Sequence, residues 1–152
     1  MNSKQLVIFN LGDEEYAIDI TYAKEIIRVP NITRIPNVPE FIEGIFNLRG
    51  TVITVIDLKK RFGFKETGKE IDSRLLILEF DDMQIGIIVD DISEVVSIEN
   101  LEIQNIGNEI YNICSNSISG ITILGERLII LLNTLQLKSE IFNYSIGKEL
   151  ES

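Results

Sequence analysis

The sequence predicts a mainly β protein made of two similar five-stranded small β-barrels with a few short helices. Three observations lead to this fold class. The apolar segments are short, rich in Ile and Val, and bounded by Gly, Asp, Asn or Pro, which is typical of strands. The second half of the chain repeats the order of segments in the first half. Five strands per half are too few for a sandwich and suit a small closed barrel without exposed edges.

Ten segments are expected to be strands because each combines an apolar run with strand length. In chain order they are Gln5–Leu11, Tyr16–Ile20, Glu25–Val29, Gly44–Leu48, Val52–Ile56, Arg74–Phe80, Gln84–Val89, Glu94–Ile98, Gly120–Leu124 and Arg127–Leu132.

Helices are expected to be few. The stretch DLKKRF at 57–62 predicts one short helix, with Asp57 as its N-cap and Gly63 at its end. A helical turn is expected at Pro39–Glu43, and a second short helix at Asn133–Leu137. Residues 138–152 are expected to form a tail or a short C-terminal helix.

The repeat is seen when the chain is aligned with itself. A shift of 69 residues places LVIF at 6–9 on LLIL at 75–78, and EII at 25–27 on EVV at 94–96. A shift of 76 residues then places VITVID at 52–57 on LIILLN at 128–133. We therefore expect a single domain over 1–152, with a first barrel at about 5–63 and a second at about 73–137. Modules of this size are marginal alone, so an apolar interface and exchanged terminal strands are expected between them.

Composition narrows the classes of function. The net charge is −10 and the pI is about 4.5, which disfavours binding to nucleic acid or to anionic lipid. No apolar run approaches the ~18 residues of a membrane span, so direct membrane insertion is not expected. The N-terminus does not resemble a signal peptide. These features predict a cytoplasmic protein that is a monomer when alone and whose partners are other proteins.

The residue types that are missing argue against common enzyme classes. The chain has no His and one Cys, which excludes Ser–His or Cys–His nucleophile pairs, His/Cys zinc sites and an internal disulfide. It also lacks the glycine-rich phosphate loops. We expect no enzymatic activity, no catalytic residues, no metal and no cofactor.

One stretch is more specific. The segment GIFNLRGTVITVIDLKKRFG, at 44–63, resembles the signature of the CheW family of bacterial chemotaxis coupling proteins. Three further segments, at 14–44, 83–98 and 120–133, resemble the same family, and the resemblance covers about residues 5–137. The resemblance implies two intertwined five-stranded barrels and a non-enzymatic adaptor. Its implied partners are the regulatory domain of a CheA-like histidine kinase and the cytoplasmic tip of a methyl-accepting chemoreceptor, in receptor arrays at the membrane.

Arg49 is unusual because it separates two apolar runs. A charge near a barrel is costly unless it is paired, and the family resemblance implies that the motif positions of Glu25 and Arg49 lie close together. We therefore expect a Glu25–Arg49 ion pair at the rim of the first barrel. The second repeat has Gly125 or Glu126 at the position of Arg49, so only the first copy is expected to carry the charge.

The partner-binding residues are predicted from the same resemblance. The kinase-facing surface is expected at Glu25–Ile32, with Glu25, Ile27 and Ile32 as contacts. The receptor-facing groove is expected to include Phe46, Asn47, Arg49 and Val89.

Three alternatives stay open from the sequence. The chain could be a CheW-type adaptor of another motility or developmental pathway. It could be a double barrel that binds a small ligand or peptide without a signalling role, although aromatic residues are only 7% of the chain. It could also be an enzyme that uses carboxylate pairs, which would need two acids in one cleft.

Overall fold

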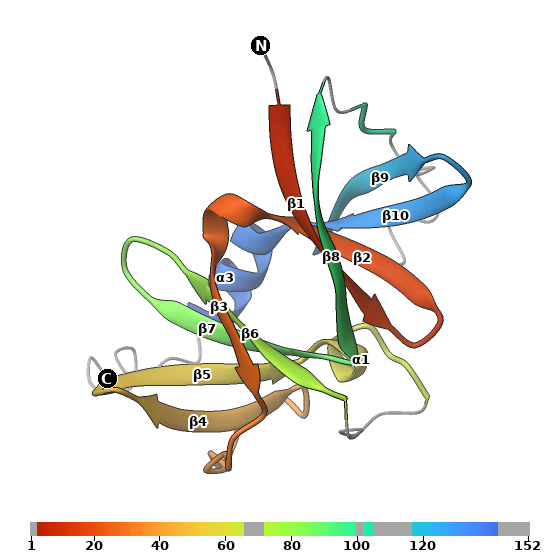
Figure 1. Ribbon diagram of the computed structural model, residues 1–152. Coiled ribbons are helices and arrows are strands. Elements are labelled where there is room, and N and C mark those ends of the chain that lie inside the picture. Colours follow the sequence, from red (N-terminus) through yellow and green to blue (C-terminus); the bar gives the residue numbers. More distant parts are fainter. Residues whose placement is uncertain (1–2, 66–71, 100–101, 105–116, 143–152) are drawn as a thin grey trace.

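The computed structural model describes residues 3–65, 72–99, 102–104 and 117–142 (Figure 1). All ten predicted strands are present, so the predicted fold class is confirmed. The strands are β1 (Ser3–Leu11), β2 (Glu14–Asp19), β3 (Ala23–Arg28), β4 (Ile42–Leu48), β5 (Thr51–Asp57), β6 (Arg74–Glu79), β7 (Gln84–Val89), β8 (Asp91–Glu99), β9 (Ile118–Leu124) and β10 (Arg127–Leu132). The helical elements are η1 (Ile20–Tyr22), α1 (Leu58–Arg61) and α3 (Thr134–Phe142).

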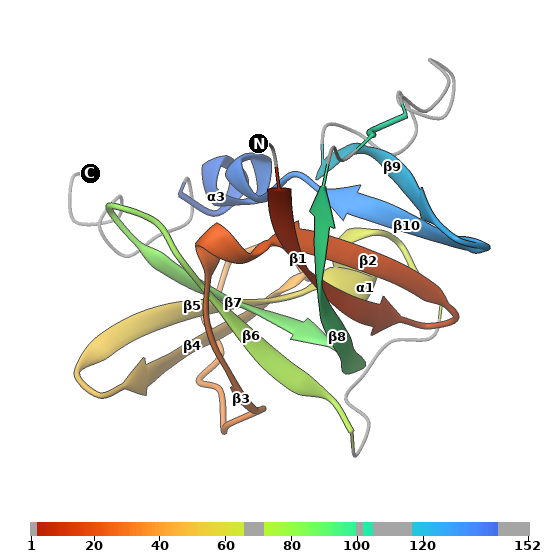
Figure 2. The ribbon, with the colours of Figure 1, turned by 45° about the horizontal axis from the view of Figure 1, so that its top comes forward.

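The strands form two five-stranded sheets that exchange strands between the two halves of the chain. We call the sheet ordered β8-β1-β2-β10-β9 sheet A and the sheet ordered β3-β6-β7-β5-β4 sheet B. Sheet A occupies the upper part of Figure 1 and sheet B the lower part, and Figure 2 shows the same two sheets in a turned view. The expected barrels at 5–63 and 73–137 therefore do not coincide with the sheets. Each half places two strands in one sheet and three in the other, because the chain crosses to the opposite sheet after β2 and again after β7.

The sequence repeat is visible in the strand register. Leu6 pairs with Asp19 in sheet A, and a shift of 69 residues converts this pair into Leu75 with Ile88, which is a pair in sheet B. The parallel pair Ile130–Tyr16 likewise corresponds to Thr54–Ile85. Corresponding strands thus hold corresponding places and registers in the two sheets.

Each sheet curls until its two edge strands approach each other. The chain that follows β3 makes a bridge to β4 between Thr33 and Ile45, with N–O distances of 2.8 Å in both directions. The chain that follows β8 makes the corresponding bridge between Gln104 and Ile121. These bridges connect the edges of each sheet, as a small closed barrel requires.

Three apolar clusters form the core of the described residues. The largest lies between the sheets and contains buried side chains from both, including Phe9 and Leu11 of sheet A and Leu76 and Ile87 of sheet B. We call this cluster the seam. Two smaller clusters fill the interiors of the curled sheets, one around Ile8 in sheet A and one around Ile77 in sheet B. The expected apolar interface between the barrels is confirmed.

The helices begin as the sequence predicts. The Asp57 carboxylate caps α1 by accepting a hydrogen bond from the Lys60 amide at 3.2 Å. Asn133 caps α3 in the same way through the Gln136 amide at 3.1 Å. Helix α3 extends beyond the predicted Leu137 to Phe142, because Leu137 and Ile141 are buried in the seam. The expected helical turn at Pro39–Glu43 is a single hydrogen-bonded turn that leads directly into β4.

Gly44 is required by the close approach of the bridging segment. Its φ is 145°, and a Cβ placed on it would lie 2.0 Å from the Thr33 carbonyl oxygen. Gly50, in the β4–β5 turn, also has positive φ, but a Cβ there would meet nothing within 4 Å.

We expect Gly44→Ala to lower the free energy of unfolding by about 2–4 kcal/mol, because it adds a clash to backbone strain. Gly50→Ala is the matched control and should cost about 1–2 kcal/mol, from strain alone. Urea denaturation followed by circular dichroism measures both. Equal losses for the two variants would contradict the close approach at Thr33.

Candidate partner-binding site

The β4–β5 hairpin and β3 meet through the predicted ion pair. The Arg49 guanidinium donates a hydrogen bond to the Glu25 carboxylate. Glu25 lies on β3 and Arg49 in the turn after β4, and these are the two edge strands of sheet B. The pair therefore spans the open side of the sheet. The Arg49 side chain is 65% exposed, whereas that of Glu25 is 27% exposed, so the cation remains available to solvent.

The turn that holds Arg49 is well defined. Arg49 has a φ of 51°, in the left-handed region that non-glycine residues rarely adopt. The side-chain oxygen of Asn47 accepts a hydrogen bond from the Gly50 amide at 2.8 Å. Asn47 thus fixes the turn, and the turn aims the arginine at Glu25.

The four predicted receptor-facing residues do not share one surface. Asn47 and Arg49 are exposed, whereas Phe46 is half-buried and packs against the interior cluster of sheet B. Val89 is wrong as a surface residue, because its exposure is 0% and it belongs to the seam. It ends β7 on the face that packs against sheet A, so a receptor could not reach it in this conformation.

The predicted kinase-facing anchors are also placed differently. Ile27 and Ile32 are half-buried and pack against the interior cluster of sheet B, which corrects the expectation that they are exposed. The exposed apolar residue of β3 is their neighbour Ile26, at 44%. Val52, which is paired with Asn47 across the hairpin, is exposed at 53%. Strand alternation limits the exposed positions to one face, but it does not say which face that is.

The second repeat also places an arginine beside the corresponding glutamate, but this arginine lies in β10 and not in the β9–β10 turn. Arg127, the first residue of β10, donates to both carboxylate oxygens of Glu15, at 3.0 and 2.7 Å. It also lies 3.1 Å from Glu94, which corresponds to Glu25 in the repeat. The turn position that corresponds to Arg49 thus has no arginine, as expected, but Arg127 brings a guanidinium to the carboxylate that corresponds to Glu25. The hydrogen bond from Arg127 lowers the pKa of Glu15 and keeps it ionised.

Two further ion pairs cross the seam and stabilise the arrangement of the sheets. Arg61 of α1 donates to both oxygens of Glu140 of α3, at 2.7 Å each, and its guanidinium lies over the Phe41 ring. Lys59 contacts Asp90 at 3.0 Å, and Asp90 accepts from the Gly12 amide at 2.7 Å. Both pairs are mostly buried, unlike Glu25–Arg49.

The described residues meet neither the requirements of a metal site nor those of a membrane-spanning helix. Within 3–65, 72–99, 102–104 and 117–142, no group of three or more His, Cys, Asp or Glu side chains could hold a metal ion. Among the helices described, none is long and apolar enough to cross a membrane. An exposed, pre-shaped hairpin on a rigid double barrel is a surface suited to binding another protein.

The fold and this hairpin define a double-barrel interaction module. Comparison with known proteins identifies its family: the model of the CheW-like domain matches residues 5–141. The chain belongs to the CheW-like family, whose members are non-enzymatic scaffold proteins of chemotaxis signalling.

Individual relatives agree with this assignment. The chemotaxis protein CheW of Klebsiella aerogenes is 35% identical over 90% of this chain and 82% of its own. That of Treponema pallidum is 38% identical over 89% of this chain and 82% of its own. The crystal structure of the scaffolding protein TtCheW from Thermoanaerobacter tengcongensis superimposes with a TM-score of 0.78 and 41% identity, over 88% of this chain and 86% of that one.

Arg49 and Arg61 should differ sharply in their effect on stability. Arg49→Ala should change the free energy of unfolding by less than about 1 kcal/mol, because exposed pairs contribute little. Arg61→Ala should cost about 2–4 kcal/mol, because it leaves Glu140 partly buried and unpaired. Urea denaturation at neutral pH measures both. A larger loss for Arg49→Ala would mean that the hairpin pair is mainly structural.

Glu140 should also make stability depend on pH. Burial alone would raise the pKa of Glu140, but the hydrogen bond and charge of Arg61 lower it below its ordinary value of 4.5. The folded-state pKa is thus below the unfolded one, so this contribution is complete above pH 4.5 and is lost as pH falls through the folded pKa.

Glu140→Gln should therefore reduce the loss of stability between neutral pH and acidic pH below 4.5, where this carboxylate takes up its proton. Urea denaturation over that range tests it, with Glu126→Gln in the exposed β9–β10 turn as the control. An unchanged pH dependence in Glu140→Gln would contradict the role of the pair.

Proposed function

We propose that this scaffold joins the cytoplasmic tips of methyl-accepting chemoreceptors to the regulatory domain of a CheA-like histidine kinase. The protein would act in the cytoplasm, recruited to membrane-associated receptor arrays. Family membership supports the kind of partner, and the acidic charge is consistent with protein rather than nucleic-acid partners. The observation that carries the proposal is the ion pair that holds an exposed arginine at the tip of the β4–β5 hairpin.

The two partners would use different faces of sheet B. For the receptor we propose the hairpin tip, with Asn47, Arg49 and the exposed Val52. For the kinase we propose the β3 edge, with Glu25 and the exposed Ile26. Glu25 is shared, because it anchors Arg49 while lying on β3. Binding at one surface could thus be sensitive to mutations at the other.

Neither surface offers a large apolar area, so each contact should be weak and reversible. Interfaces below about 1,200 Å² are typical of transient signalling encounters. Repeated contacts in an array raise the overall affinity by avidity without any new contact. A scaffold of this kind works through many weak contacts held in register.

Co-sedimentation of kinase with receptor-tip fragments tests the proposal. Wild-type protein should bring the kinase down with the receptor fragments, whereas Arg49→Glu should reduce recovery at least about tenfold, because it places two like charges together. Lys65→Glu is the matched control, since it reverses an exposed charge outside sheet B.

The reciprocal variant separates pairing from simple loss of charge. Glu25→Arg combined with Arg49→Glu should recover part of the binding if the pair itself positions the hairpin. No recovery would mean that Arg49 contacts the partner directly. If wild-type protein brings down no kinase, coupling between these two partners is refuted.

A further inference from the structure

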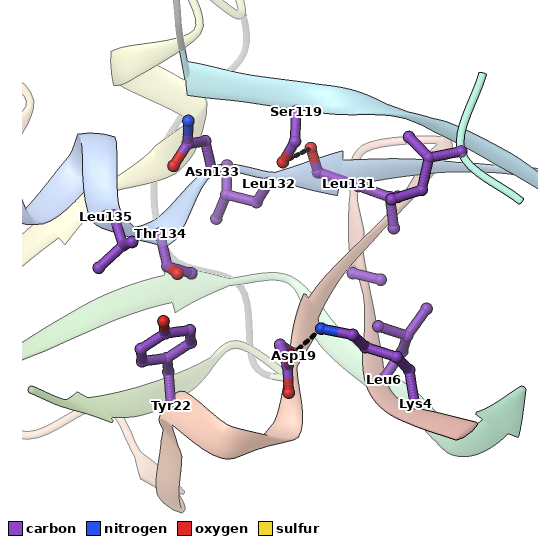
Figure 3. Close-up of a pocket in the computed structure, with 12 residues that line it drawn as sticks. Lys4, Leu6, Asp19, Tyr22, Ser119, Leu131, Leu132, Asn133, Thr134 and Leu135 are labelled. Carbon is purple, nitrogen blue, oxygen red and sulfur yellow. Dashed lines mark hydrogen bonds and ion pairs between the residues drawn. The ribbon is translucent and has the colours of Figure 1, made fainter. Parts of the chain in front are cut away.

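We propose that the open end of sheet A binds a small neutral molecule with an apolar body of about one ring and a single hydrogen-bonding group. This site is separate from the β4–β5 hairpin and goes beyond the scaffold function. Its cavity, of about 250 Å³, lies between the ends of β1, β2 and β10, η1 and the start of α3 (Figure 3).

The floor of the cavity is the apolar interior of the curled sheet. Leu6 of β1, Ala17 of β2 and Leu131 of β10 line it and belong to the interior cluster. Apolar cavities of about 150 Å³ are large enough to take up benzene, so this one has room for a ring and one substituent.

The rim is polar but carries no net charge. The Lys4 ammonium lies 3.1 Å from the Asp19 carboxylate, which also accepts a hydrogen bond from the Thr21 amide at 2.9 Å. Across the cavity, the hydroxyl of Tyr22 points toward Thr134, as Figure 3 shows. Hydroxyl groups at the rim can donate to or accept from a ligand.

The charges around the cavity disfavour the binding of an anionic ligand. Among the described residues that line the cavity, the one cation is Lys4, which is already paired with Asp19, and the protein as a whole carries a net charge of −10. A neutral phenol or alcohol matches the hydroxyl rim, whereas a carboxylate would lack a cation of its own.

The equivalent end of sheet B provides an internal comparison, because buried, uncharged side chains stand at the corresponding positions. Ile88 stands where sheet A has Asp19, and Leu58 where it has Thr134, with exposures of 4% and 0%. Ser73, also buried, replaces Lys4. The fold therefore does not require charged side chains at this end, and Lys4 and Asp19 are particular to sheet A.

Titration with phenol, followed by methyl NMR of the full-length protein, tests the site. Phenol should shift the methyl signals of Leu6, Ala17 and Leu131 in a saturable way, with a dissociation constant on the order of 1 mM for so small a ligand. Benzoate should bind at least about tenfold more weakly, since its charge would be unpaired.

Two variants introduce the side chains that stand at the corresponding positions of sheet B. Asp19→Ile and Thr134→Leu each fill part of the cavity and should weaken phenol binding at least about tenfold. Leu128→Ser, at an exposed position away from the cavity, is the control and should bind like wild type. The dispersion of the methyl NMR signals shows whether each variant is folded. One folded variant of the two is enough for the binding test.

Several results would overturn the proposal. Shifts that grow linearly with phenol, or that are equally large at Leu128, would indicate nonspecific contact. Wild-type affinity in a folded Asp19→Ile or Thr134→Leu variant would exclude this cavity, and benzoate binding as tight as phenol would exclude a neutral ligand. None of these results depends on receptor or kinase coupling.

Discussion

The seam is the contact on which the rest of the structure depends. Each half of the chain supplies two strands to one sheet and three to the other, and the largest apolar cluster lies where the sheets face each other. Neither half could bury its strands alone, since both sheets need strands from both halves. The hairpin, the cavity and the interhelical ion pair all take their positions from this exchange.

Charge is used differently inside and at the edge of this framework. Arg61 and Glu140 form a bidentate, mostly buried ion pair that joins α1 to α3 across the seam. Glu25 and Arg49 join the two edges of sheet B while the arginine stays largely exposed. The first arrangement favours stability and the second favours recognition, because a solvent-accessible guanidinium can still meet a partner.

The two repeats show how one backbone plan carries different chemistry. Glu25 and Glu94 occupy corresponding strand positions, but one meets an arginine from a turn and the other an arginine from β10. At the other end of the sheets, Ile88 is buried in sheet B, whereas Asp19 lines the cavity at the corresponding position of sheet A. Register is conserved between the repeats while the side chains at the barrel ends have diverged.

The sequence by itself determined the ten strands, both helix caps, the repeat and the family, because these depend on local pattern and spacing. It also predicted the Glu25–Arg49 contact, through the family motif. The tertiary structure decided which strands are exchanged, that Val89 is buried, and that Ile26 rather than Ile27 is exposed. The physical reason is that central strands such as β1 are apolar on both faces: Val7 packs in the seam and Ile8 in the barrel interior. Alternation separates two such faces, but only packing assigns each one its neighbour.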